Sequence, residues 1–200
     1  MPQKRTKMKL IIASNNAHKI YEIKKILSGK FDEIISLREA GISHETVEDG
    51  TTFVENALKK AREIAEISGC AALADDSGIT AHALGDEPGI YSARYASTGG
   101  GNADDEANNA LLLKNLADKA DKTAHYTAAI ALAYPDGSTI TAEGYMYGEI
   151  IENARGNRGF GYDPIFVPTG ETRTVAEMTD EEKNAISHRA NALNILLEKL

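Results

Sequence analysis

Two adjacent carboxylates, Asp75 and Asp76, are the side chains in this sequence best suited to chemistry. They follow the apolar run of residues 71–74, which we predict to be a buried strand, and they precede Ser77 and Gly78. Open α/β sheets bind ligands beyond the carboxyl ends of their strands. Because neighbouring carboxylates repel each other, a divalent cation between them would be favourable, and oxygen ligands favour Mg²⁺ over zinc. An exposed turn uses the same residue types, so that alternative stays open here.

Composition and charge limit the class of protein. The chain has 200 residues, which suits one domain, or one domain with two lobes. A net charge of −8 argues against general nucleic-acid binding, which needs a basic surface. Cys70 is the only cysteine, which is typical of a reducing cytoplasm, and no apolar run approaches the roughly 18 residues of a membrane span. We expect a cytoplasmic protein with a frayed leader at residues 1–7 and a single two-lobed domain at residues 8–200.

The first elements predict a place for an anion. A strand at residues 8–13 is followed by the polar turn Ser14-Asn15-Asn16 and then by a helix at residues 17–27. This arrangement presents free backbone N–H groups to an anion. Lys19 lies in the first turn of the helix, where a cation opposes the helix dipole unless a phosphate occupies the turn. The alternative is an ordinary exposed lysine.

A second helix follows an acidic loop. Thr51 or Thr52 is expected to begin it, Glu55 completes a capping box, and the helix ends near residue 68. The strand of residues 71–74 comes directly afterwards, so Glu48 of the acidic loop could return to the same sheet edge as Asp76. Glu48 could instead act only on the helix dipole.

The middle of the chain predicts a mixed sheet. Ser77-Gly78 is interpreted as a bend before a further strand, in which His82 is assigned no chemistry. Two long strands joined by a tight hairpin would form an extended platform with mixed pairing. The remaining elements expected here are a strand at 79–84, a helix from Asn102 or Asp104 to about 120, and the hairpin strands 124–134 and 138–151.

Residues 155–164 are the second informative stretch. Their glycines allow a ligand to approach the backbone, and Phe160 and Tyr162 could stack on a planar base. Alternatively, these aromatic side chains fill the core. Ser187 is expected to cap the last helix, which places His188 and Arg189 in its first turn, where a bound anion or nearby acids would balance their charge.

Together these residues resemble the inosine triphosphate pyrophosphatase family, also called Ham1-like proteins or XTP/dITP diphosphatases. Four motifs match in order and extend over nearly the whole chain. They are residues 13–19, residues 52–57, residues 74–78 with 88–95, and residues 159–166 with Lys183 and 186–189. Each motif is weak alone, whereas the ordered set is strongly specific.

The resemblance implies an α/β fold with a long mixed β-sheet flanked by helices, two lobes around a central cleft, and a homodimer. The family cleaves purine nucleoside triphosphates, preferably ITP, dITP and XTP, to the monophosphate and pyrophosphate. By position, Glu48 and Asp76 would hold Mg²⁺, and Asp76 would be the general base. The substrate residues implied are Ser14, Asn15, Asn16, Ala17, His18, Lys19, Ser77, Phe160, Gly161, Tyr162, Asp163, Lys183, His188 and Arg189.

The sequence also departs from the family pattern. Arg158 and Ala190 replace residues that are commonly small or glycine, and residues 124–127 lack a common arginine and cysteine. A Maf-like pyrophosphatase with another base preference is the nearest rival, and a non-catalytic nucleotide-binding regulator is the rival from another class. Lys19 and the clustered acids argue against the regulator, because a mere binder has little use for acids beside a triphosphate.

Overall fold

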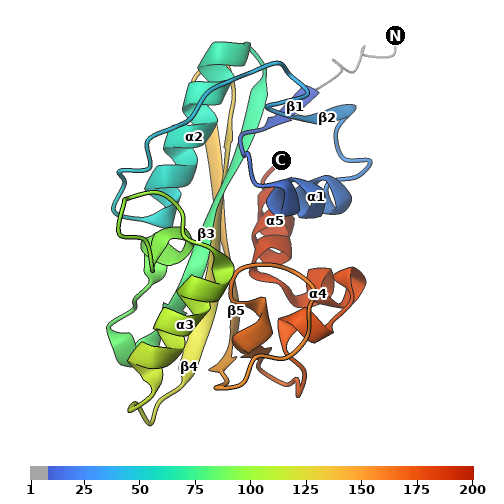
Figure 1. Cartoon of the computed structure of the whole chain (residues 1–200). Coiled ribbons are helices and arrows are strands. Elements are labelled where there is room, and N and C mark those ends of the chain that lie inside the picture. Colours follow the sequence, from blue (N-terminus) through green and yellow to red (C-terminus); the bar gives the residue numbers. More distant parts are fainter. Residues whose placement is uncertain (1–8) are drawn as a thin grey trace. The chain divides into compact units, whose positions relative to one another are not determined.

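The computed structural model describes residues 9–200, so the prediction of a frayed leader lies outside the described residues. Within this range the strands form one sheet in the order β2-β1-β3-β4-β5-β6 (Figure 1). Strand β1 is parallel to β2 and β3, whereas β5 is antiparallel to β6, which confirms the predicted mixed sheet. The strands are β1 (Lys9–Ile12), β2 (Glu33–Ser36), β3 (Ala71–Ala81), β4 (Thr123–Ala133), β5 (Thr139–Ile150) and β6 (Phe166–Pro168).

Helices flank this sheet, so the α/β class is confirmed. The α-helices are α1 (Ala17–Ile26), α2 (Phe53–Ser68), α3 (Asp105–Leu116), α4 (Asp180–Ile186) and α5 (His188–Glu198). Short 3-10 helices occupy His82–Leu84, Gly89–Arg94, Asp163–Ile165 and Val175–Glu177. Among residues 9–200, none of the helices combines the length and the apolar character needed to cross a membrane.

The chain divides into two compact units. The first contains the described residues up to Asp76 together with Ala129–Ala142 and Leu193–Leu200. The second contains Ser77–Ala128 and Glu143–Ala192. The boundary therefore falls inside β3, between Asp76 and Ser77.

Small side chains build the core of the first unit. One face of α2 contributes alanines and Ile64, and these pack against alternate residues of β1, β3 and β4. Thr52 begins the helix as predicted, because its hydroxyl accepts a hydrogen bond from the Glu55 amide at 3.1 Å and Glu55 closes the capping box. The helix ends at Gly69, whose φ of 63° is the left-handed conformation that favours glycine.

Larger side chains build the core of the second unit. Tyr126 of β4 lies edge-on to Phe166 of β6, with ring centres 4.9 Å apart. Ile79 and two leucines of α3 belong to the same buried cluster. The Tyr126 ring is thereby held in place within this buried cluster.

The predicted bend at Ser77-Gly78 is wrong, because β3 runs through it without interruption to Ala81. The hydroxyl of Ser92 lies against Gly78, so that a Cβ added there would stand 2.3 Å from Ser92 Oγ. The same Oγ accepts a hydrogen bond from the Ile79 amide at 2.9 Å. Gly78 is thus required for close packing and not for a turn.

Three other features differ from the prediction. Asp75 and Asp76 lie within β3 and not after its end, although they do lie beyond the end of β1, whose last residue Ile12 pairs with Leu73. Helix α3 ends at Leu116, earlier than expected, and His82 lies in a 3-10 helix.

Candidate active site

The two central acids point to opposite faces of β3, because side chains alternate along a strand. Asp76 shares its face with Ala72 and Ala74, which pack against α2. Asp75 lies on the other face, where its Oδ1 is 2.6 Å from the ammonium of Lys19 on α1. Figure 1 shows α1 and α2 on either side of this part of β3. The acids are therefore not a pair that shares one proton.

Two side chains of α2 hold Asp76. Asn56 donates from Nδ2 to Asp76 Oδ2 at 3.1 Å, and Lys60 Nζ lies 3.4 Å from Asp76 Oδ1. Asn56 and Lys60 are four residues apart, so they share one face of the helix. The backbone amide of Gly50 donates to Asn56 Oδ1, which fixes the orientation of the amide. Asp76 is 7% exposed and is thus positioned by two donors in a nearly dry environment.

The ammonium of Lys60 brings the acidic loop to the strand. It donates to Glu48 Oε1 at 2.8 Å and to the backbone oxygen of Asp75 at 2.9 Å. Glu48 thus returns to the sheet beside Asp76, as the sequence predicted. Three oxygen atoms, from Glu48, Asp75 and Asp76, converge on one cation.

Burial and charge set the protonation of this cluster. Burial raises the pKa of Asp76, and the positive charges of Lys60 and Lys19 only partly oppose that effect. Burial alone would lower the pKa of Lys60, but attraction to Asp76 and Glu48 outweighs it and raises the pKa. Lys60 therefore stays charged, while Asp76 holds its proton more readily than an ordinary aspartate.

The turn before α1 is only partly available to an anion. Asn16 caps the helix, and its Oδ1 accepts from the amides of His18 at 3.0 Å and Lys19 at 3.1 Å. The backbone N–H of Asn16 donates to Ser14 Oγ at 3.1 Å. The expectation of free N–H groups is therefore wrong for these three amides, because the Asn16 side chain satisfies those of His18 and Lys19 and the Ser14 hydroxyl satisfies that of Asn16. Asn15, Ala17 and His18 are exposed.

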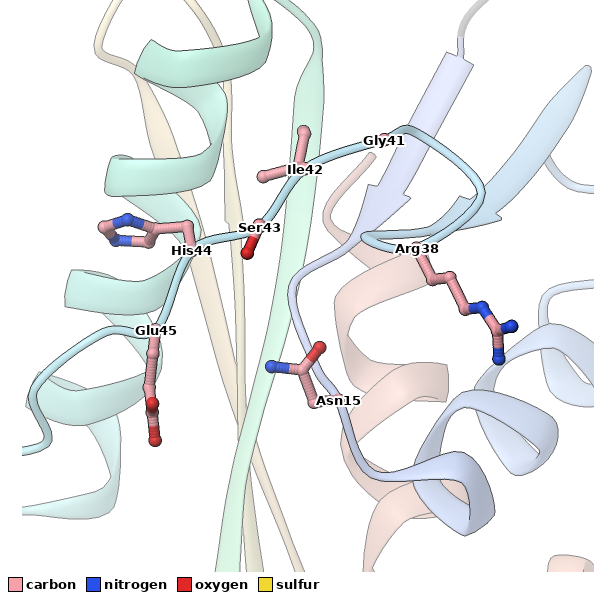
Figure 2. A pocket seen from close by; sticks show the side chains of 7 residues that line it. All are labelled: Asn15, Arg38, Gly41, Ile42, Ser43, His44 and Glu45. Carbon is pink, nitrogen blue, oxygen red and sulfur yellow. The ribbon is translucent and has the colours of Figure 1, made fainter.

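An open pocket of about 700 Å³ lies in the first unit. Figure 2 shows Asn15, on the segment after β1, facing the loop that carries Ser43, His44 and Glu45. Of the predicted site residues, Asn15 is the one that lines it. Because Glu48, Asp75 and Asp76 lie outside this lining, we place the chemistry at the charged cluster and not at the pocket.

A buried ion pair organises the predicted site residues of the second unit. Lys183 Nζ lies 2.8 Å from Asp163 Oδ2, and their side chains are 7% and 4% exposed. The same Oδ2 accepts from the Phe160 amide at 3.1 Å, and Oδ1 accepts from the Tyr126 hydroxyl at 3.3 Å. Asp163 is thus a structural centre of the 159–163 loop. A Cβ at Gly159 would stand 2.1 Å from this carboxylate, which explains the glycine.

Phe160 lies beside two cations. The Lys183 ammonium is 4.8 Å from its ring centre, and the Arg189 guanidinium carbon is 5.9 Å away. Arg189 is buried and donates from Nη2 to Ser77 Oγ at 3.0 Å. The half-exposed Phe160 ring is therefore a flat surface with hydrogen-bond donors beside it.

The other aromatic and cationic candidates are packed into the unit. His188 stacks on Tyr126 with ring centres 4.7 Å apart and an angle of 10° between the rings. Tyr162 is buried in the hydrophobic core, where its hydroxyl donates to the Ser92 carbonyl oxygen at 2.7 Å. For Tyr162 the core-filling interpretation is confirmed. The backbone of Gly161 is tied to α3 through Asp105 and Asn109.

Asn56 and Lys60 are the residues of the charged cluster to which the sequence assigned no role. Asn56 lies inside the second motif, and Lys60 follows it by one helical turn, next to the buried alanines of α2. The position of Lys60 next to the buried apolar face of α2 is the sequence feature that could have indicated a buried charge. Within residues 9–200, no three His, Cys, Asp or Glu side chains gather closely enough to form a metal site by themselves.

The chain is similar to known proteins over nearly its whole length. The family model of the Ham1 family matches residues 10–199. A dITP/XTP pyrophosphatase of Ralstonia nicotianae is 47% identical over 96% of both chains, and one of Leuconostoc mesenteroides is 50% identical over the same shares. A solved Ham1 protein from Coxiella burnetii is 39% identical with a TM-score of 0.86, covering 96% of this chain and 100% of that chain. The Ham1 protein of Staphylococcus aureus is 40% identical with a TM-score of 0.84, covering 95% and 96%.

Proposed function

Because the chain belongs to the Ham1 family, we propose that it hydrolyses dITP, XTP and ITP to the monophosphate and pyrophosphate. This reaction would remove deaminated purines from the nucleotide pool. The observation that carries the assignment is the buried cluster in which Asp76 is held by Asn56 and Lys60 beside Glu48. Such an arrangement supports water activation next to a highly charged substrate.

The donor set of this cluster fits Mg²⁺. Glu48 and Asp76 offer carboxylate oxygens, and both already contact one cation, the Lys60 ammonium. Magnesium in enzymes is held by one or two carboxylates together with substrate phosphates. Bound to Glu48 and Asp76, it would neutralise phosphate charge and favour deprotonation of water.

The side chains of the first unit supply the chemistry in this proposal. Asp76 accepts a proton from a water whose oxygen forms the new bond to the α-phosphorus. The bond between the α-phosphorus and the oxygen that bridges it to the β-phosphorus breaks, and pyrophosphate leaves with the electron pair. Lys19 and Lys60 stabilise the negative charge that develops, and stabilisation of this kind supplies much of the rate in phosphoryl transfer. The turn from Ser14 to Lys19 holds the triphosphate.

The side chains of the second unit supply base recognition. Phe160 stacks on the purine, and Lys183 and Arg189, which lie beside its ring, contact the base together with Ser77. Tyr162, Asp163 and His188 support this surface from within the unit. Inosine and adenine differ at position 6, where one carries an acceptor oxygen and the other a donor amine. Because arginine offers only donors, Arg189 favours the 6-oxo purine.

Replacing Arg189 with methionine is expected to reduce the preference for ITP over ATP by about 10–150-fold, the equivalent of one charged hydrogen bond. Methionine fills much of the volume of this buried side chain but removes its donors, whereas lysine would again offer only donors. The measurement is kcat/KM for ITP, ATP and GTP. Arg155→Met, at a half-exposed arginine that donates to the Thr172 carbonyl oxygen, is the matched control. An unchanged ITP-to-ATP ratio would remove Arg189 from base recognition.

A nucleotide panel tests the function itself. With Mg²⁺, purified protein is expected to release pyrophosphate from dITP, XTP and ITP far faster than from dTTP, UTP or ATP, and chelation by EDTA should abolish release. Release from dTTP or UTP instead would favour a Maf-like enzyme, and nucleotide binding without product would favour a regulator. We further propose that the protein is cytoplasmic and that both compact units belong to one catalytic domain. We also propose that it is a homodimer, for which light scattering would give about twice the chain mass of 21.5 kDa.

A further inference from the structure

Two histidines of the second unit, to which the proposed function assigns no role, face each other. His82 lies at the start of the 3-10 helix that follows β3 and is exposed, and His125 lies on β4 and is half-buried. Nε2 of His82 is 2.9 Å from Nδ1 of His125. They are 43 residues apart in sequence, so only the fold brings them together.

The tautomer of His82 follows from its other hydrogen bond. The Thr123 hydroxyl donates to Asp121 Oδ1 at 2.6 Å, so its oxygen accepts from the Nδ1–H of His82 at 2.8 Å. Nε2 of His82 therefore carries the lone pair and faces His125. Histidines that bind metals characteristically donate their other ring N–H to an oriented acceptor, and the Asp121-Thr123-His82 chain has this form.

The ring spacing suits one shared ion. The ring centres of His82 and His125 are 5.1 Å apart. Two imidazoles on one tetrahedral zinc, with Zn–N of about 2.0–2.1 Å, have ring centres about 5.2 Å apart. The rings now point almost directly at each other, as in an N–H···N hydrogen bond. To aim both nitrogens at one tetrahedral ion, each ring would have to turn by about 35°.

We propose that His82 and His125 form a binding site for one late first-row divalent ion, with Zn²⁺ as the ion of reference. The two imidazoles supply two ligands, and water completes the coordination from the exposed side of His82. Imidazole nitrogen suits zinc, nickel and copper, whereas the carboxylates of the active site suit magnesium. Burial and the neighbouring His82 lower the pKa of His125, with Asp86 opposing them, and the neutral ring is the form that binds metal.

Titration of chelator-stripped protein with Zn²⁺, with Mg²⁺ in excess to occupy the carboxylates, tests this site by calorimetry. One ion per chain is expected. His82→Ala or His125→Ala should each weaken binding by at least tenfold, and Thr123→Val, which removes the hydroxyl that orients His82, by about 10–100-fold. His44→Ala is the matched control, because His44 is a half-buried histidine paired with Glu63 in the first unit; it should bind as the unchanged protein does.

A spectroscopic readout locates the ion independently of affinity. The chain has no tryptophan, so tyrosine emission is visible, and the His125 ring lies 5.9 Å from that of Tyr145 and 5.4 Å from that of Tyr147. Stoichiometric Cu²⁺ is expected to quench part of this emission, and the quenching should disappear in Tyr145→Phe/Tyr147→Phe. Circular dichroism and thermal melting verify that each variant is folded. Absence of Zn²⁺ binding, or equal binding by His82→Ala/His125→Ala, overturns the proposal.

Discussion

Asp76→Asn is expected to lower kcat for dITP by about 10²–10⁴-fold, the usual cost of losing a general base. Asparagine keeps the shape of the side chain and one oxygen, but it cannot accept the proton of the attacking water. Steady-state pyrophosphate release at saturating Mg²⁺ measures the effect. Asp118→Asn is the matched control, because Asp118 is a largely exposed aspartate whose side chain is 83% accessible. Near-normal turnover in Asp76→Asn would exclude Asp76 as the base.

The pH profile separates Asp76 from its neighbour. Burial raises the pKa of Asp76, so the low-pH limb of the rate should lie above the ordinary aspartate value of about 3.9. Below the raised pKa the carboxyl is protonated and cannot act as a base, so the rate falls as pH falls. Asp76→Asn should lose this limb. Asp75→Asn should retain it, because Asp75 contacts Lys19 on the other face of β3 and acts through that lysine.

Lys183→Met is expected to destabilise the protein by about 3–5 kcal/mol, because it leaves the buried Asp163 carboxylate without its cation. Methionine fills much of the same volume, so the main loss is the charge. Urea denaturation measures the change in the free energy of unfolding. For a chain of this size each kcal/mol corresponds to about 2–4 °C in Tm.

Two further variants test the cause of that loss. Lys59→Met removes the ammonium of an exposed pair with Asp49 and should leave the free energy of unfolding nearly unchanged, because solvent screens such pairs. Lys183→Met combined with Asp163→Asn removes both charges and should recover a large part of the stability. If the double variant is as unstable as Lys183→Met, packing and not charge explains the effect.

The sequence predicted the elements whose signals are local. Thr52 and Glu55 stand three residues apart, so the start of α2 could be derived from the capping box alone. The hairpin of β4 and β5 was equally accessible, because Pro135-Asp136-Gly137 lies between two long strands, a nearly continuous apolar one and an alternating one. The length of β3 could not be predicted this way. Asp-Asp-Ser-Gly has the composition of a turn, and only contacts from distant residues hold it extended.

Long-range contacts also explain which site residues were found. Asp76 and Glu48 were identified by motif and charge. The role of Lys60 depends on the packing of α2 against the sheet, which buries its ammonium among three oxygens. Tyr162 shows the opposite case, since its position in a substrate motif did not reveal that its ring belongs to the core. His82 looked like an ordinary strand residue until the fold brought it to His125.

The alternation along β3 sets how this segment can change during evolution. Substitutions within residues 71–74 alter packing but leave Asp75 and Asp76 on their own faces of the sheet. Deleting or inserting a single residue there would exchange the two faces, so that Asp75 would meet Asn56 and Lys60 while Asp76 met Lys19. Sequence length between residue 71 and the acids is therefore expected to be invariant among functional relatives, even where the amino acids themselves vary.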